Sequence, residues 1–354
     1  MKPYYADDLV TLHQGDALDV SRELDPGSVQ TIVTSPPYFG LRDYGVDGQL
    51  GAEQSVQEYV DRMVALFRSL RDVLADDGTL WLNLGDSYSG AGPSGASYDS
   101  ATTRRRAEGD GMDGKFRVSK RLAERDLDYS RKKPVPTSGI PAKNLIGVPW
   151  RVAFALQDDG WILRSDIIWA KPNPMPESVA DRPTKAHEYL FLMSKSPRYY
   201  YDAEAIKEPA ITGFNGSEFH TGKTGEHQLE RASKQPRFGG NKYGLGNDTP
   251  KSGNEYAPNG RANKRTVWSV PTVPFSEAHF AVYPPELIRP CILAGSRRGD
   301  TVLDPFSGSG TTGMVATQEG RRYIGVDLNR EYLELSLRSR FAQPVLDMTG
   351  GDVA

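Results

Sequence analysis

Four consecutive residues near the N-terminus, Ser35-Pro36-Pro37-Tyr38, carry groups that can hold a planar exocyclic amine. Such an amine on a nucleobase is a poor nucleophile because its lone pair is delocalised into the ring. Two acceptors on its protons, the Ser35 hydroxyl and the Pro36 carbonyl, would draw the nitrogen towards a tetrahedral, more nucleophilic geometry. Tyr38 offers a ring for stacking, a contact worth about 1–3 kcal/mol per base. An isolated Pro-Pro-Tyr is more often only a stiff loop, so a second motif is needed.

That second motif is a glycine-rich turn near the other end of the chain. Asp304-Pro-Phe306 follows a short apolar run, and Ser307-Gly308-Ser-Gly310-Thr311 then opens a helical stretch. Glycines at these positions allow a tight turn and let a ligand approach the main chain. Residues 322–327 form a second apolar run that ends in Asp327, the layout in which an acid binds ribose hydroxyls. On its own this layout could equally serve NAD or another nucleotide.

Both motifs follow predicted strands. The run at 30–35 is β-rich and stops at two prolines, so it predicts a buried strand with a rigid turn at its carboxyl end, where open α/β sheets place their sites. Hydrophobic spacing predicts helices at 55–74 and 149–156. Further strands are expected at 78–84, 161–169, 188–193, 300–304 and 322–327. Strand 188–193 is expected to run antiparallel, and loop 171–176, stiffened by prolines, to line a base pocket.

With both motifs in this order, the chain resembles the S-adenosylmethionine-dependent amino-methyltransferases of DNA, in the permuted group whose catalytic tetrapeptide precedes the cofactor loop. The resemblance covers most of the chain except two polar insertions. It implies a Rossmann-like α/β fold with a mostly parallel sheet of seven strands and helices on both faces. It also implies catalysis by Ser35, Pro36, Pro37 and Tyr38 on a base flipped out of duplex DNA. The expected cofactor contacts are Asp16, His279, Ala281, Asp304, Phe306, Ser307, Gly308, Gly310, Thr311, Asp327 and Leu328.

The first residue of the tetrapeptide bears on which base is methylated. Adenine-N6 members usually carry Asp or Asn there, whereas Ser35 resembles the cytosine-N4 members. A hydroxyl needs only to accept one amine proton, so the chemistry permits either base. Cytosine N4 is the predicted target, with adenine N6 by the same mechanism as the alternative.

Composition fits this interpretation. The chain has 354 residues, 38% of them hydrophobic and 25% charged, enough for a substantial core. We expect no membrane span, no signal peptide and no metal site, and a cytoplasmic protein of a prokaryote or phage. The single cysteine, Cys291, follows a proline as cytosine-C5 nucleophiles do, but its apolar helical surroundings predict a small buried hydrophobe. Asp86 either faces the site or ends a strand.

Basic residues are concentrated in two polar segments, although the net charge is −3. Residues 104–133 contain eleven Lys/Arg against six Asp/Glu, and residues 231–265 contain eight against two. Basic segments on an acidic body are a plausible footprint for a phosphate backbone. Family members of this order carry their target-recognition region where the second segment lies; for the first, a solvated loop is equally supported. The predicted DNA contacts are Arg231, Lys234, Arg237, Lys242, Arg261, Lys264 and Arg265.

The predicted organisation follows from these segments. We expect a catalytic half at 1–86, a basic insertion at 87–140, further sheet strands at 141–203, target recognition at 204–266, a cofactor half at 267–345 and a tail at 346–354. Expected partners are duplex DNA and a cognate restriction endonuclease acting separately, with the protein a monomer or homodimer. Two other classes stay open: an RNA or protein-glutamine methyltransferase, and a catalytically silent DNA-binding module. A dehydrogenase is the least favoured option.

Overall fold

The computed structural model describes residues 2–40, 48–90, 140–210, 261–273 and 282–341. The chain divides into two compact units, one formed by Met1–Asp202 with Thr266–Ala354 and the other by Ala203–Arg265. In the second unit the described strands are β7 (Glu208–Pro209) and β8 (Arg261–Ala262), which pair antiparallel. The other described helices and strands belong to the first unit.

The first unit is built on a nine-stranded sheet with the order β1-β2-β11-β10-β3-β4-β6-β5-β9. Its strands are β1 (Tyr5–Ala6), β2 (Val10–Gln14), β3 (Val29–Thr34), β4 (Leu74–Leu84), β5 (Ile162–Ala170), β6 (His187–Ser194), β9 (Val267–Ser269), β10 (Thr301–Asp304) and β11 (Arg322–Asp327). Strand β6 runs antiparallel to both β4 and β5, as predicted. The five neighbouring strands β2, β11, β10, β3 and β4 are all parallel, so their carboxyl ends form one edge of the sheet.

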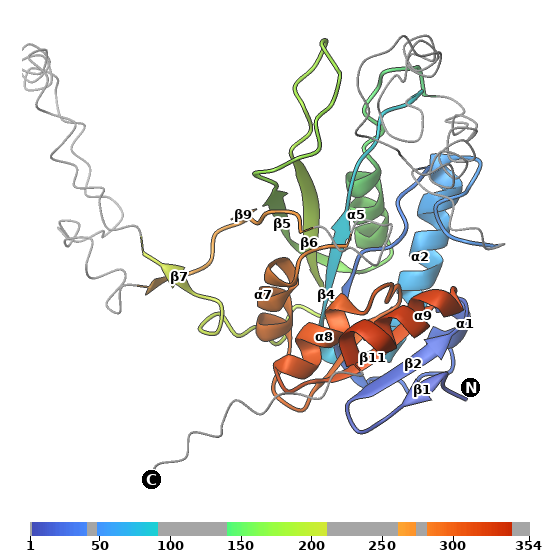
Figure 1. The fold of residues 1–354 in the computed structure, drawn as a ribbon, viewed down its shortest axis with the longest axis vertical. Coiled ribbons are helices and arrows are strands. Elements are labelled where there is room, and N and C mark those ends of the chain that lie inside the picture. The colour runs from blue at the N-terminus through green and yellow to red at the C-terminus, as the bar shows by residue number, and fades with distance from the viewer. Residues whose placement is uncertain (1, 41–47, 91–139, 211–260, 274–281, 342–354) are drawn as a thin grey trace, which may run out of the picture. The chain divides into compact units, whose positions relative to one another are not determined.

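Helices cover both faces of the sheet (Figure 1). On one face lie α1 (Ala17–Ser21), α2 (Val56–Val73) and α5 (Val148–Asp158); on the other lie α7 (Pro285–Gly295), α8 (Thr311–Gln318) and α9 (Arg330–Ser336), followed by η2 (Leu337–Phe341). Strand β10 leads through α8 to β11 on one side, and β3 leads through α2 to β4 on the other. The winding therefore reverses between β10 and β3. Open α/β sheets bind their ligands at such a switch point.

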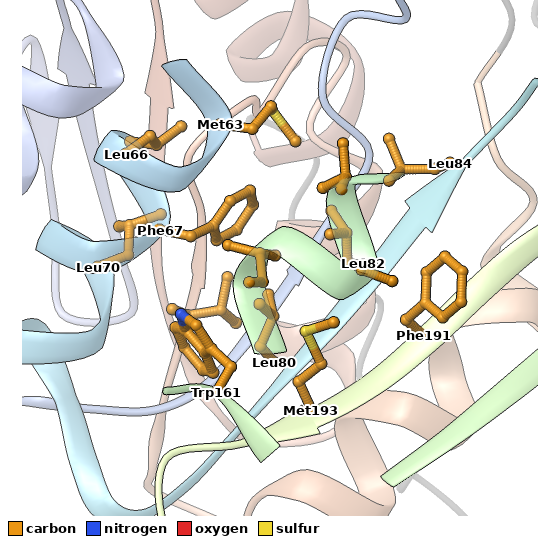
Figure 2. Close-up of a cluster of buried hydrophobic side chains, with 14 of the residues drawn as sticks. Met63, Leu66, Phe67, Leu70, Leu80, Leu82, Leu84, Trp161, Phe191 and Met193 are labelled. Carbon is orange, nitrogen blue, oxygen red and sulfur yellow. The ribbon is translucent and has the colours of Figure 1, made fainter. Parts of the chain in front are cut away.

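The main core lies between β4, β6 and the helices α2 and α5. Figure 2 shows α2 side chains directed towards those of the sheet, and the labelled residues are Met63, Leu66, Phe67, Leu70, Leu80, Leu82, Leu84, Trp161, Phe191 and Met193. The α2 residues recur at helical spacing, and the even-numbered β4 residues share one face because side chains alternate along a strand. Helix α2 begins where the Ser55 side chain accepts a hydrogen bond from the Glu58 N–H.

The doubly wound α/β architecture confirms the predicted fold class, with differences at the edges. The six strands predicted by their residue ranges are present, β2 brings the number to the expected seven, and the short strands β1 and β9 extend the sheet at its two ends. Strand β4 begins at Leu74 rather than at Gly78, because the fully buried Leu74 pairs with Val29 before a register shift. Helix α8 begins at Thr311, directly after the glycine turn.

Cys291 is fully buried in α7, which confirms its predicted role as a small apolar residue in a packed helix. Among the described residues, no helix is long and apolar enough to cross a bilayer. Within the same ranges, no group of three or more His, Cys, Asp or Glu side chains is placed to hold a metal ion.

Candidate active site

The two motifs, about 270 positions apart in the sequence, meet at the switch point of the sheet. Thr34 ends β3 directly before Ser35, and Asp304 ends the neighbouring strand β10. The Thr34 hydroxyl donates to Asp304 Oδ1 over 2.6 Å. This bond joins the tetrapeptide's strand to the start of the glycine loop.

Asp304 is buried, and its carboxylate is saturated with donors. Besides Thr34, it accepts the Phe306 N–H at 3.0 Å, the Thr312 hydroxyl at 2.6 Å and the Tyr283 hydroxyl at 2.9 Å. Burial raises the pKa of Asp304 above its ordinary value, although the hydrogen bonds act in the opposite direction. With all these donors in place, Asp304 holds the loop, β3 and the Tyr283 segment together.

The loop after Asp304 makes a tight turn that depends on two glycines. Gly308 and Gly310 have φ angles of 51° and 76°, in the left-handed region that favours glycine. The Ser307 N–H donates to Val326 O at 2.8 Å, and the Ser307 hydroxyl accepts from Tyr323 at 2.9 Å. Gly310 is the N-cap of α8 and has no side chain to cap it. The helix N-terminus therefore opens directly from the turn, with Thr311 as its first residue.

Asp327 ends β11 beside this loop. Its Oδ2 accepts the Gly308 N–H at 2.8 Å and its Oδ1 accepts the Asn329 N–H at 2.8 Å. Burial raises the pKa of Asp327 to about 6, even though both N–H groups favour the charged form. Each carboxylate oxygen keeps further acceptor capacity. A partly buried acid next to a glycine turn is suited to the hydroxyls of a ribose.

The tetrapeptide is held from several sides. The Tyr59 hydroxyl donates to the Pro37 carbonyl at 2.9 Å, which ties the turn to α2. The Ser35 hydroxyl donates to Tyr38 Oη at 3.3 Å, and Tyr38 Oη donates to Glu188 Oε2 at 2.7 Å. A Cβ on Gly85 would lie 2.5 Å from the Tyr38 ring, so the ring packs on the bare backbone at the end of β4. Burial, and next the charge of Glu188, raise the pKa of Tyr38 well above its ordinary value.

Three further polar residues surround this turn. Lys171 forms an ion pair with Glu188 Oε1 and lies 4.2 Å over the Trp169 ring. Lys185 Nζ donates to the Asp86 carbonyl at 2.6 Å, and burial lowers the pKa of Lys185. The Asp86 carboxylate accepts the Gly147 and Val148 N–H groups at 3.0 Å, so it serves the turn at the start of α5.

The remaining predicted contacts are placed less directly. Asp16 follows β2 at the same sheet edge, but its carboxylate caps α1 by accepting the Leu18 and Asp19 N–H groups. Leu328 directly follows Asp327 and is partly buried. His279, Ala281, Arg231, Lys234, Arg237 and Lys242 lie outside the described residues. Arg261, Lys264 and Arg265 belong to the second unit, where Arg265 pairs with Glu208 and Arg261 donates to the Lys207 carbonyl.

Sequence reasoning did not assign Tyr283, Asn83 or Glu188 to the site. Glu188 is the second residue of β6, and because β6 is antiparallel its first residues lie at the carboxyl edge of the parallel strands. A carboxylate at the start of a reversed strand was the available signal. Asn83 occupies a buried position in β4 and gave no such signal.

Comparison with known proteins decides the family. The sequence model of the N6/N4 DNA methylases matches residues 29–338. The chain belongs to the N6/N4 DNA methylase family. Type II methyltransferase M.Cfr9I of Citrobacter freundii is 44% identical over 327 residues, covering 92% of this chain and 86% of that protein. Type II methyltransferase M.SmaI of Serratia marcescens is 44% identical over 322 residues, covering 91% and 87%.

A solved structure supports the fold of this methylase. The PvuII DNA methyltransferase (cytosine-N4-specific) superposes with a TM-score of 0.58 at 19% identity, covering 98% of this chain and 90% of that one. The chain is thus a DNA methyltransferase whose tetrapeptide and glycine loop lie at the switch point of a doubly wound sheet.

Proposed function

We propose that this DNA methylase transfers a methyl group to the exocyclic N4 of cytosine in duplex DNA. The observation that carries the proposal is the position of Ser35, with its hydroxyl bonded to Tyr38 at the carboxyl end of β3. The serine in the first position of the tetrapeptide favours cytosine. The PvuII enzyme, which shares the fold, is named cytosine-N4-specific, and this agrees with the choice.

S-adenosylmethionine is the methyl donor, and the residues present fit it. The bare glycine loop at 308–310 offers backbone to the methionine portion, and Asp327 offers a partly buried carboxylate to the ribose. When bound, S-adenosylmethionine supplies a methyl group on a sulfonium, which is an electrophile. Asp16, Phe306, Ser307, Thr311 and Leu328 complete the proposed contacts on this edge, with Asp304 fixing the shape of the loop.

The tetrapeptide prepares the nucleophile. A base inside a duplex must be flipped out to reach Ser35, at a cost of a few kcal/mol. Ser35 Oγ and the Pro36 carbonyl would then accept hydrogen bonds from the two N–H groups of the amine, which makes the nitrogen lone pair available for an in-line displacement. The nitrogen would gain the methyl group and afterwards release one of its protons to solvent. Pro37 and Tyr38 hold this geometry, so most of the acceleration comes from positioning.

The DNA is held by the basic segment at 204–266 in this proposal. Its residues Arg231, Lys234, Arg237, Lys242, Arg261, Lys264 and Arg265 contact phosphates and orient the duplex. The likeness to Type II methyltransferases supports a role in cytoplasmic restriction-modification, in which a separate endonuclease would cut the unmodified site.

Nucleoside mass spectrometry on unmethylated DNA incubated with protein and S-adenosylmethionine tests the base. We expect N4-methylcytosine, and N6-methyladenine instead would overturn the choice of base while leaving the family intact.

Ser35→Ala tests the site. Losing one of two amine acceptors should lower the methyl-transfer rate by about 100-fold or more, by analogy with the loss of one oxyanion-hole donor. The dissociation constant of S-adenosylmethionine should stay unchanged, because Ser35 does not belong to the glycine loop. An equal loss of cofactor binding would contradict the assigned role.

A further inference from the structure

The hydrogen bonds around Tyr38 all run from donor to acceptor in one direction along the catalytic turn. Its hydroxyl carries one proton and has two acceptors in reach, Glu188 Oε2 at 2.7 Å and Asn83 Oδ1 at 3.3 Å. The shorter, charge-assisted bond to the carboxylate takes the proton. Tyr38 Oη then offers only a lone pair to the Ser35 hydroxyl, which lies 3.3 Å away. The Ser35 hydroxyl is therefore the donor of this hydrogen bond.

Glu188 is itself held so that it can only accept. Lys171 pairs with its Oε1, and Asn83 Nδ2 lies 3.3 Å from its Oε2 while also donating to the Tyr189 carbonyl at 3.0 Å. The side chains of Glu188 and Lys171 are 16% and 18% exposed, so water competes little for these bonds. An ionised carboxylate has no proton to give, and Glu188 is the acidic partner of an ion pair with the Lys171 ammonium.

We propose that Glu188 is a positioning residue that sets the direction of the hydrogen bonds in the tetrapeptide. Glu188 accepts a hydrogen bond from Tyr38, and Tyr38 accepts one from Ser35. Ser35 Oγ therefore faces the target as an acceptor only. An exocyclic amine meets a lone pair there and is bound. A ring carbonyl at the same place meets a second acceptor and is repelled. The series of hydrogen bonds that starts at Lys171 and Glu188 thus selects an amino group before the methyl transfer. No proton is transferred along it.

The proposal rests on the proposed role of Ser35, and a double-mutant cycle separates the two. Glu188→Gln keeps the shape of the side chain but places an amide next to Tyr38. Because the amide N–H₂ can donate, the direction of the hydrogen bonds can reverse, and the Ser35 proton can then point towards the amine. Tyr38→Phe removes the connecting hydroxyl. We expect each single variant to lower the single-turnover methyl-transfer rate on duplex DNA by about 10- to 100-fold, the effect of one hydrogen bond to a charged group.

In the Tyr38→Phe background, Glu188→Gln should cause less than a twofold further loss, because the connection is already cut. The dissociation constant of S-adenosylmethionine should stay the same in all four proteins. Glu319→Gln is the matched control: Glu319 is a partly buried carboxylate paired with Arg289 at the far end of α8, and its change should leave the rate unaltered.

The outcomes separate cleanly. Multiplicative losses from Glu188→Gln and Tyr38→Phe would mean that Glu188 acts through general structure, which overturns the inference, as would an unaltered rate in Glu188→Gln alone. If Ser35→Ala retains the wild-type rate, the proposed site itself is wrong. If Ser35→Ala abolishes transfer while the cycle is multiplicative, only the assignment of Glu188 fails.

Discussion

The proposed contact between Asp327 and the ribose would make cofactor binding depend on pH. Burial raises its pKa to about 6, and each of its oxygens already accepts a backbone N–H. Ribose hydroxyls donate to a carboxylate, so binding requires the ionised form. The ionised fraction falls as the pH drops through 6, and cofactor binding must weaken with it.

The dissociation constant of S-adenosylmethionine, measured by calorimetry from pH 8 to pH 5, should be constant above about 7. Below about 6 it should rise, approaching tenfold per pH unit for a single proton. Asp327→Asn should bind weakly and show no such rise. A wild-type constant that stays flat to pH 5 would remove Asp327 from the ribose.

At this scale the sequence predicted residues that belong to motifs and missed those that support them. Ser35, Tyr38, Asp304 and Asp327 stand in runs whose composition is unusual for ordinary loops. Tyr283 and Glu188 reach the site only through pairings that depend on the folded sheet. A carboxylate's partners are set by tertiary contacts, which spacing along one strand does not reveal.

Among the elements, α7 is fitted closely to the sheet. Its last residue, Gly295, packs over a polar group in β3 and β4: a Cβ there would lie 2.6 Å from Thr31 Oγ1, 2.7 Å from Thr79 Oγ1 and 2.9 Å from Trp81 Nε1. These three side chains are buried, and Thr31 bonds Thr79 at 3.0 Å. Their positions leave no room to relax.

Gly295→Ala should therefore lower the free energy of unfolding by about 1–3 kcal/mol, as overpacking of a core does. Helix propensity alone predicts the opposite sign, a gain of roughly 0.5–1 kcal/mol. Urea unfolding followed by circular dichroism distinguishes the two. An unchanged or increased stability would mean that α7 can shift away from the sheet.

Most element positions followed from hydrophobic pattern, and the misses have physical causes. Strands 30–35 and 322–327 and helix 55–74 are long and periodic enough to be recognised. Strand β1 has two residues and β9 three, too short to show alternation. The start of β4 was wrong because Leu74, although it continues the helical spacing of α2, is taken into the sheet by pairing with Val29.

For the whole molecule, charge is distributed unevenly between segments. Residues 231–265 carry eight basic and two acidic residues in a chain of net charge −3. Neutralising phosphates releases counterions. Each phosphate contact therefore adds about 0.9 to the steepness with which the logarithm of the association constant falls with the logarithm of the salt concentration.

Replacing Arg231, Lys234, Arg237 and Lys242 together by Gln should reduce that slope by about 3 to 4, measured by fluorescence anisotropy on a DNA duplex. Cofactor affinity should be unchanged. Replacing Arg104, Arg105 and Arg106 by Gln is the control from the other basic segment. A slope reduced only in the control would assign DNA contact to the 87–140 insertion.

The order of the sheet also has a consequence for synthesis of the protein. Strand β2 is made early, yet its parallel neighbour is β11, the last strand among the described residues, and the Gly15 N–H donates to the Asp327 carbonyl between the two strands. A growing chain on the ribosome carries its complete tetrapeptide but has neither Asp304 nor Asp327. The proposed cofactor site therefore cannot form in the nascent chain until β11 has emerged, although the tetrapeptide has been made long before.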